Sequence, residues 1–133
     1  MPNSIVEKVV EFNQKVIGVE QGLKVTELSG PDYSLLKNQL DEEITELEEA
    51  WEDEDLVGQV DALLDLAYFV FGGLYKMGLS AEQIEHCFGL IHDANMTKSA
   101  GKVAKRVVEG TVDAVKPADF VDPKQAIIEY LNV

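Results

Sequence analysis

Cysteine is almost absent from this chain of 133 residues, in which Cys87 is the single example. One cysteine excludes an intrachain disulfide framework and a zinc site built on cysteines, so an intracellular location is the default expectation. Long hydrophobic runs are also missing, since no stretch reaches about 18 continuous apolar residues. The residues from Met1 to Ile5 lack the basic start of a signal peptide. The sequence therefore predicts neither a transmembrane helix nor a secretory leader.

Positive charge is scarce as well. Eleven Lys and Arg residues stand against 25 Asp and Glu residues, which gives a formal net charge of −14. Proteins that bind the phosphate backbone of nucleic acids or an anionic membrane surface need clustered Lys and Arg. We therefore expect no nucleic-acid polymer and no membrane among the partners. The length suits one domain over residues 1–133, with a core at about 4–98 and a tail at 99–133.

The charges that are present are unevenly distributed. No basic residue occurs between Lys37 and Lys76. Twelve acids fall in that interval: Asp41, Glu42, Glu43, Glu46, Glu48, Glu49, Glu52, Asp53, Glu54, Asp55, Asp61 and Asp65. Basic residues concentrate later, from Lys98 to Arg106. The sequence thus has an acidic centre and a basic segment in its last third.

Apolar residues recur every three or four positions, which predicts an all-α fold with four main helices. The expected helices span about 4–17, 32–51, 56–77 and 80–95. Beyond Thr97 the pattern is irregular. Two short pieces, 103–108 and 111–115, are candidates for a small hairpin, and 123–131 for a closing helix. The segment 56–77 is apolar almost all round, so it belongs in a bundle core or a subunit interface.

Two carboxylates lie on this most apolar segment. Asp61 and Asp65 are four positions apart, so they lie about 40° apart on one face of the helix. Like charges at this spacing repel, and burying them unpaired is costly. Because residues 38–75 offer no Lys or Arg, a divalent cation is the economical way to neutralise them. Oxygen ligands favour Mg²⁺ or Mn²⁺.

The preceding helix carries a matching group of acids, Glu42, Glu43 and Glu46. Glu43 and Glu46 are three positions apart and hence adjacent on one face. A short acidic turn joins the two helices, so we expect an antiparallel hairpin in which the two pairs of carboxylates face each other. The alternative for a Glu-rich helix is a solvated face.

The motif Glu42-Glu43-x-x-Glu46, followed by Asp61-x-x-x-Asp65, resembles the signature of the all-α nucleoside triphosphate pyrophosphohydrolases. This superfamily includes MazG, phosphoribosyl-ATP pyrophosphohydrolase and dimeric dUTPase. Its usual second motif is Glu-x-x-Asp, whereas here Asp61 stands one residue earlier and position 62 is Ala. Ala94-Asn-Met-Thr-Lys98 resembles the MazG-like branch found in phages and bacteria. The resemblance covers about residues 5–122 and implies a four-helix bundle-like MazG-type fold that forms homodimers or homotetramers.

The resemblance also implies an activity and a set of site residues. The activity is Mg²⁺- or Mn²⁺-dependent hydrolysis of the α–β phosphate bond of (deoxy)nucleoside triphosphates, giving a monophosphate and pyrophosphate. Glu43, Glu46, Asp61 and Asp65 would hold the metal. Glu42 would be the general base or a second-metal ligand, and the alternative is an ordinary surface Glu.

Three further residues are candidates for substrate binding. Asn95 and Lys98 would contact phosphate or ribose, and their alternatives are roles in ending a helix. Asn13 would read a base edge, and its alternative is a polar surface position. The expected location is the cytoplasm of a bacterium or of a phage-infected host cell. The competing functional hypothesis is a non-catalytic acidic helical bundle that binds metal or a basic protein partner.

Overall fold

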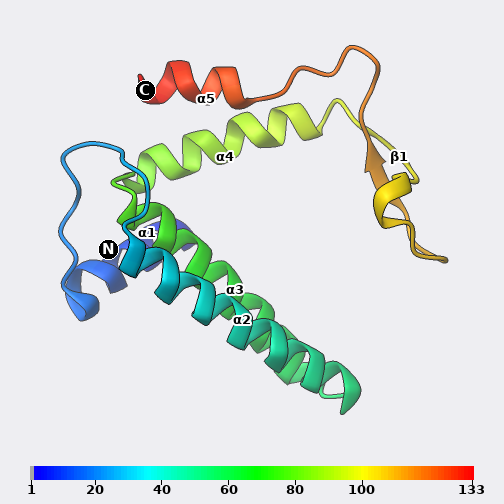
Figure 1. Cartoon of the computed structure of the whole chain (residues 1–133), viewed down its shortest axis with the longest axis horizontal. Coiled ribbons are helices and arrows are strands. Elements are labelled where there is room, and N and C mark those ends of the chain that lie inside the picture. Colours follow the sequence, from blue (N-terminus) through cyan, green and yellow to red (C-terminus); the bar gives the residue numbers. More distant parts are fainter. Residues whose placement is uncertain (1) are drawn as a thin grey trace. The chain divides into compact units, whose positions relative to one another are not determined.

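Helices account for most of the chain in the computed structural model, which describes residues 2–133 (Figure 1). The α-helices are α1 (Ile5–Phe12), α2 (Gly30–Glu52), α3 (Leu56–Lys76), α4 (Ala81–Asn95) and α5 (Lys124–Leu131). A π-helical turn at Asn13–Ile17 continues α1. The strands are short, β1 (Ser99–Gly101) and β2 (Asp113–Val115). The predicted all-α class is confirmed.

Side-chain caps explain where the helices begin. The Ser4 hydroxyl accepts the backbone N–H of Glu7 at 3.0 Å, and the Glu7 side chain accepts the Ser4 N–H in return. Ser80 and Gln83 form the same reciprocal capping box before α4, as the sequence predicts. The carboxylate of Asp55 caps α3 by accepting the Gly58 N–H at 2.9 Å. Local sequence therefore places these boundaries without help from tertiary contacts.

A loop from Gly18 to Ser29 is fastened to the end of α3. The Tyr75 hydroxyl donates to the carbonyl of Val19 at 2.8 Å, and the Thr26 N–H donates to the carbonyl of Met77 at 2.8 Å. Gly78 ends the helix with φ 99°, and a Cβ at this position would lie 2.2 Å from the Lys24 carbonyl oxygen. Glycine is thus required here by both the backbone angle and the close approach of the loop.

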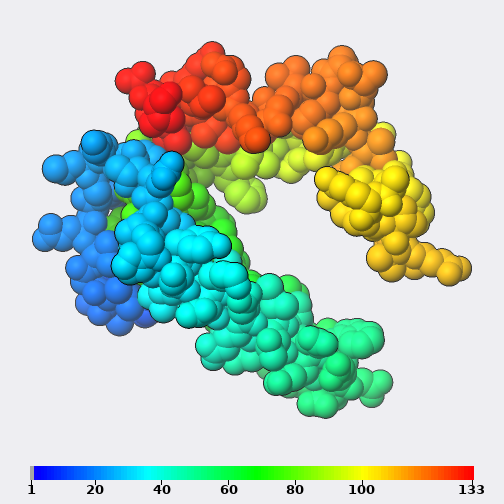
Figure 2. All heavy atoms as spheres, in the orientation of Figure 1, coloured from blue at the N-terminus to red at the C-terminus, as the bar shows by residue number. Residues whose placement is uncertain are grey.

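Helices α2 and α3 form an antiparallel hairpin that turns at Asp53–Asp55 (Figure 1). Val9 on α1 and Ala62 and Tyr75 on α3 are each 1% exposed and belong to the core of this unit. Figure 2 shows the hairpin with α2 in cyan and its tip in green, and other apolar side chains of α3 are exposed. Leu56 is 72% exposed and Leu64 is 63% exposed. The prediction that α3 needs a covering surface agrees with this exposure.

Among residues 2–133, α3 is also the one helix long and apolar enough to cross a membrane. One such helix is weak evidence for a span, because core helices of soluble proteins pass the same criterion. Asp61 and Asp65 stand in its middle, and an acidic side chain at a bilayer centre costs about 2.5–3.5 kcal/mol. The two carboxylates therefore oppose a membrane-spanning role for α3.

The chain forms two compact units, one extending to Ile84 and the other comprising Glu85–Val133. In the second unit β1 and β2 pair antiparallel, with Ser99 opposite Val115. The expectation of a strand at 103–108 is wrong, because Ala104–Arg106 closes into a 3-10 turn. The partner of β2 is instead the segment around Gly101, whose missing side chain leaves room for Val115 Cγ2, 2.8 Å from an ideal Cβ. The single-domain organisation stays a prediction.

Candidate active site

The most buried acid of the hairpin is Glu43 on α2, which is 7% exposed. Its Oε2 atom is buried and has no hydrogen-bond partner among the described residues. Burial raises the pKa of the Glu43 carboxyl to about 7, and the carboxylates of Glu46, Asp65 and Glu42 contribute in the same direction. A buried oxygen without a partner is costly, so this position calls for a bound proton or a cation.

Asp65 faces the same region from α3. It is half-buried, and its pKa is raised by burial first and then by the negative charges of Asp61 and Glu46. Across the hairpin, the charge of Asp65 acts on Glu43 and the charge of Glu46 acts on Asp65, whereas Asp61 acts on Asp65 from the same helix. Glu43 and Glu46 on α2 thus act electrostatically on Asp65 of α3, and the metal-binding role of Glu43, Glu46, Asp61 and Asp65 stays a prediction.

Burial is distributed differently from the sequence interpretation. From the sequence, α3 was expected to be the buried helix, so Asp61 and Asp65 were expected to be the acids whose burial costs most free energy. In the structure Asp61 is exposed, as are Glu46 and Glu42, whereas Glu43 on α2 is buried. Leu56 and Val57 at the start of α3 are 72% and 73% exposed. The cluster therefore has a buried end at Glu43 and an open end toward solvent.

Among the described residues, no basic side chain neutralises this cluster. The two lysines that flank it are engaged elsewhere: Lys37 Nζ lies 2.7 Å from Asp41, and Lys76 Nζ lies 3.9 Å from Asp32. Within residues 2–133, no three Asp, Glu, His or Cys side chains converge closely enough to form a ready metal site. Like charges repel, which opposes closer approach of these side chains without a cation. The donor set consists of hard oxygens, which suits a divalent cation such as Mg²⁺ or Mn²⁺.

A cavity of about 100 Å³ lies in the same unit. Its lining includes Phe12, Asn13, Asp32, Gln39, Tyr68, Phe69, Gly72 and Lys76. Gln39 is one helical turn before Glu43, and Phe69 is one turn after Asp65, so the cavity adjoins the carboxylates along the hairpin. The rings of Phe12 and Tyr68 meet edge to face, with their centroids 5.4 Å apart.

Asn13 is 5% exposed, so the alternative of a polar surface position is wrong. Its Nδ2 atom donates to the carbonyl of Val9 at 2.9 Å. A Cβ on Gly72 would lie 3.2 Å from this nitrogen, so the absence of a side chain at 72 makes room for the amide. Sequence reasoning missed Gln39, Tyr68 and Gly72, although their helical spacing from Glu43 and Asp65 was a usable signal.

Asn95 and Lys98 belong to the second unit, whereas the carboxylates belong to the first. Asn95 is the exposed last residue of α4, and its carbonyl accepts the N–H of Lys98 at 3.0 Å. Lys98 is half-buried, and its Nζ atom lies 5.5 Å from the ring centre of Phe120. Their predicted role in substrate binding stays a prediction.

The family model of phosphoribosyl-ATP pyrophosphohydrolase matches residues 16–95, a span that includes both carboxylate-bearing helices. The chain belongs to this family. Membership confirms the predicted superfamily, the all-α nucleoside triphosphate pyrophosphohydrolases, and implies nucleotide pyrophosphohydrolase activity. The family generally uses divalent metals and is typically soluble and cytoplasmic. Comparison with curated proteins gives no match.

Proposed function

We propose that this pyrophosphohydrolase cleaves the α–β phosphate bond of (deoxy)nucleoside triphosphates, releasing a nucleoside monophosphate and pyrophosphate. The observation that carries the proposal is the Glu43 carboxyl, buried with an unpartnered oxygen among three other acids. Without a cation, the burial and mutual repulsion of these carboxylates destabilise the fold, and a bound cation would offset both effects. An NTP carries negative charge of its own, so an acidic protein needs a cation to accept it.

Glu43, Glu46, Asp61 and Asp65 are the residues that would hold Mg²⁺ or Mn²⁺. When bound, the ion would offset the negative charge of the phosphates and lower the pKa of a water molecule. Glu42 is exposed next to the buried Glu43, so its carboxylate can accept the proton of an attacking water. The water oxygen forms the new bond to the α-phosphorus, and pyrophosphate leaves with the bonding electron pair. The alternative role of Glu42, as a ligand of a second metal, uses the same exposed carboxylate.

The adjoining cavity is the proposed base site. At about 100 Å³ it is smaller than a pocket for a whole drug-sized ligand, so it suits a single base while the phosphates extend toward the carboxylates. The buried amide of Asn13 supplies a polar group for a base edge, and Phe12 and Tyr68 supply aromatic walls. A site of this size favours a nucleoside triphosphate over phosphoribosyl-ATP, which carries a second ribose phosphate on its base.

The exposed apolar side of α3 supports a homodimer or homotetramer. Leu56, Val57 and Leu64 are each more than 60% exposed, and covering them with a second copy removes apolar surface from water. We propose that the oligomer acts on the nucleotide pool in the cytoplasm of a bacterium or of a phage-infected cell.

Pyrophosphate release tests the proposal. The substrates are the four NTPs, the four dNTPs, dUTP and phosphoribosyl-ATP, each with Mg²⁺ or Mn²⁺. The wild type is expected to release pyrophosphate from at least one triphosphate, and Asp65→Asn to lose activity by about 100-fold or more. Glu48→Gln, an exposed acid on the same α2, is the matched control and retains activity.

Two outcomes oppose the proposal. Release from phosphoribosyl-ATP alone contradicts the assigned substrate class. Absence of hydrolysis with every nucleotide supports the competing hypothesis of a non-catalytic acidic bundle that binds metal or a basic protein.

A further inference from the structure

Five of the eleven basic residues gather around one cavity in the second unit. This basic cavity has a volume of about 490 Å³ and is lined by Lys98, Lys102, Val103, Lys105, Arg106, Ala114, Val115 and Lys116. The segment 98–116 contains only two acids, Glu109 and Asp113, in a protein whose net charge is −14. The surroundings of the cavity are therefore positively charged, although the chain as a whole is negatively charged.

The strand pairing brings two of these lysines together. Ser99 pairs with Val115, so Lys98 and Lys116 stand next to each other where the ladder ends. Both ammonium groups lie near one aromatic ring, that of Phe120, at 5.5 Å and 5.0 Å from its centre. Like charges brought close together repel. The ring offsets part of that cost, and an anion between the two lysines would offset the rest.

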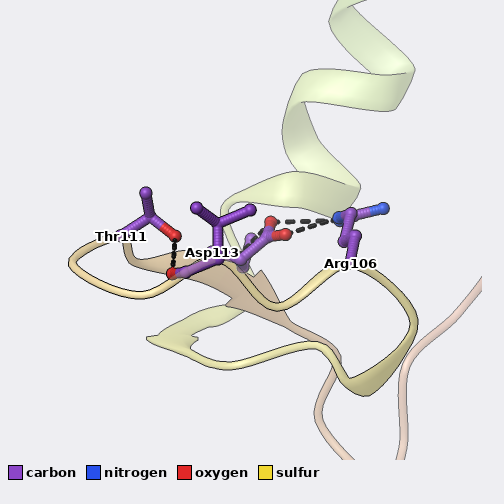
Figure 3. Close-up of polar contacts among 5 residues, drawn as sticks. Arg106, Thr111 and Asp113 are labelled. Atoms are coloured by element: carbon purple, nitrogen blue, oxygen red, sulfur yellow. Dashed lines mark hydrogen bonds and ion pairs between the residues drawn. The ribbon is translucent and has the colours of Figure 1, made fainter.

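Asp113 is an acid of this hairpin, and its carboxylate is already paired with Arg106. Asp113 and Arg106 point toward one another in Figure 3, with Nη2 of Arg106 3.0 Å from Oδ1 of Asp113 and a second bond through Nε. The hydrogen bond from Arg106 lowers the pKa of Asp113 to about 2, and Lys98 adds to this effect. Within residues 2–133, no ion pair engages Lys98, Lys102, Lys105 or Lys116. These four lysines thus remain without a paired carboxylate.

The chain geometry holds the lysines around the cavity. Lys102 follows β1, and its Nζ atom donates to the carbonyl of Thr111 on the return of the hairpin. Lys105 stands in the 3-10 turn, whose neighbour Arg106 is tied to Asp113. The Thr111 hydroxyl donates to the Val108 carbonyl at 2.6 Å and closes the loop (Figure 3). These bonds position the turn without neutralising its positive charge.

We propose that the basic cavity binds a diphosphate or triphosphate group. Lysine ammonium groups bind phosphate oxygens as point charges, and several of them around one cavity suit a compact, multiply charged anion. The volume is in the range of pockets for small molecules. A nucleic-acid polymer is opposed by the acidic remainder of the protein, whereas a short phosphate chain is contained within the cavity. The group comes from free pyrophosphate or from the phosphate chain of a nucleotide.

Calorimetric titration of the 133-residue chain with pyrophosphate, in EDTA and at low salt, tests this site. EDTA removes divalent cations, so neither hydrolysis nor binding through the carboxylates contributes, and a failure here leaves the proposed hydrolase function untouched. One saturable site per chain is expected. The double variant Lys102→Gln/Lys105→Gln should weaken binding by about 10-fold or more. Lys116→Gln, on the other side of the cavity, should weaken it as well.

The matched control is Lys8→Gln/Lys124→Gln, which removes the same charge from positions outside the cavity lining. It should bind pyrophosphate within about twofold of the wild type. Far-UV circular dichroism checks that each variant is folded. ATP and AMP distinguish the sources: tighter binding of ATP than of pyrophosphate assigns the site to a nucleotide, and the reverse assigns it to the free anion.

Three results would overturn the proposal. The first is equal binding of AMP and pyrophosphate, since the site would not recognise a phosphate chain. The second is unchanged binding in both folded cavity variants. The third is binding of a 20-nucleotide single strand without any binding of pyrophosphate, which would make the cavity a nucleic-acid surface.

Discussion

Glu43 on α2 and Asp65 on α3 interact electrostatically across the hairpin, and the negative charge of Asp65 helps to raise the pKa of Glu43. Asp65 in turn has a raised pKa, first because of its own burial. Two helices that pack well elsewhere thus place mutually repelling groups at their contact. This local instability, in a hairpin without a Lys or Arg between residues 38 and 75, is the physical link between the acidic sequence and the proposed cation site.

Glu43 should make the stability of the metal-free protein depend on pH. Its pKa is about 7 in the folded protein against an ordinary value of 4.5, so between these values the folded state holds a proton that the unfolded state has released. The free energy of unfolding should therefore be highest below pH 4.5 on account of this group and fall as the pH rises to about 7. Melting temperatures measured in EDTA from pH 4.5 to 8 follow this change.

The variant Glu43→Gln removes the titrating group. At pH 8 it should unfold at a higher temperature than the wild type, and the difference should shrink toward pH 5, where Glu43 is protonated. Glu48→Gln, exposed on the same helix, should follow the wild-type curve. A difference between Glu43→Gln and the wild type that stays constant with pH would contradict the role given to Glu43.

Divalent metal should reverse the instability at pH 8. A ligand at 100 times its dissociation constant stabilises the folded state by about 2.7 kcal/mol, which corresponds to a rise in melting temperature of several degrees for a chain of this length. Mg²⁺ or Mn²⁺ should produce this rise in the wild type and in Glu48→Gln. Glu43→Gln and Asp65→Asn should show little or none, because each removes one charged ligand. Equal rises in all four proteins would place the metal elsewhere.

The sequence predicts the helices well because their signals are local. Ser80 with Gln83, and the three- and four-residue spacing of apolar side chains, set the helix positions without information from the rest of the chain. The electrostatic contact of Glu43 and Glu46 with Asp65 follows from the same spacing once the short turn is recognised.

What the sequence could not predict depends on tertiary packing. Whether Glu43 or Asp61 is the buried acid is decided by which face of each helix meets the other, and composition alone favoured α3. The sequence predicted the wrong partner for β2 because glycine usually interrupts a strand. At Gly101, however, the missing Cβ leaves room for Val115. The burial of Asn13 likewise depends on Gly72, which is 59 positions away in the sequence.

Gly72→Ala should impair substrate binding more than stability. The added methyl would lie 3.2 Å from Nδ2 of Asn13 and displace the buried amide that lines the proposed base site. A change of one methyl group in a binding pocket alters substrate discrimination by about 10-fold or more, so KM should rise about 10-fold. In contrast, Gly89→Ala in α4 meets no atom within 4 Å and should stabilise the helix by up to about 1 kcal/mol with unchanged KM. Steady-state kinetics with the best triphosphate gives KM for both variants. Equal KM values would contradict a role of Asn13 in binding the base.

Leu64→Glu should dissociate the proposed oligomer. Leu64 is 63% exposed on α3, and burying a leucine stabilises an interface by about 1.5–3 kcal/mol. A two-fold interface contains the residue twice, so placing a charge there should weaken dimerisation by at least about 100-fold. Leu23→Glu introduces the same charge at a loop leucine that is 105% exposed, and it should leave the mass unchanged. Light scattering coupled to size-exclusion chromatography gives the mass of each. A wild type that runs as a monomer at every concentration would contradict the interface, and the exposed apolar side of α3 would then need a different partner.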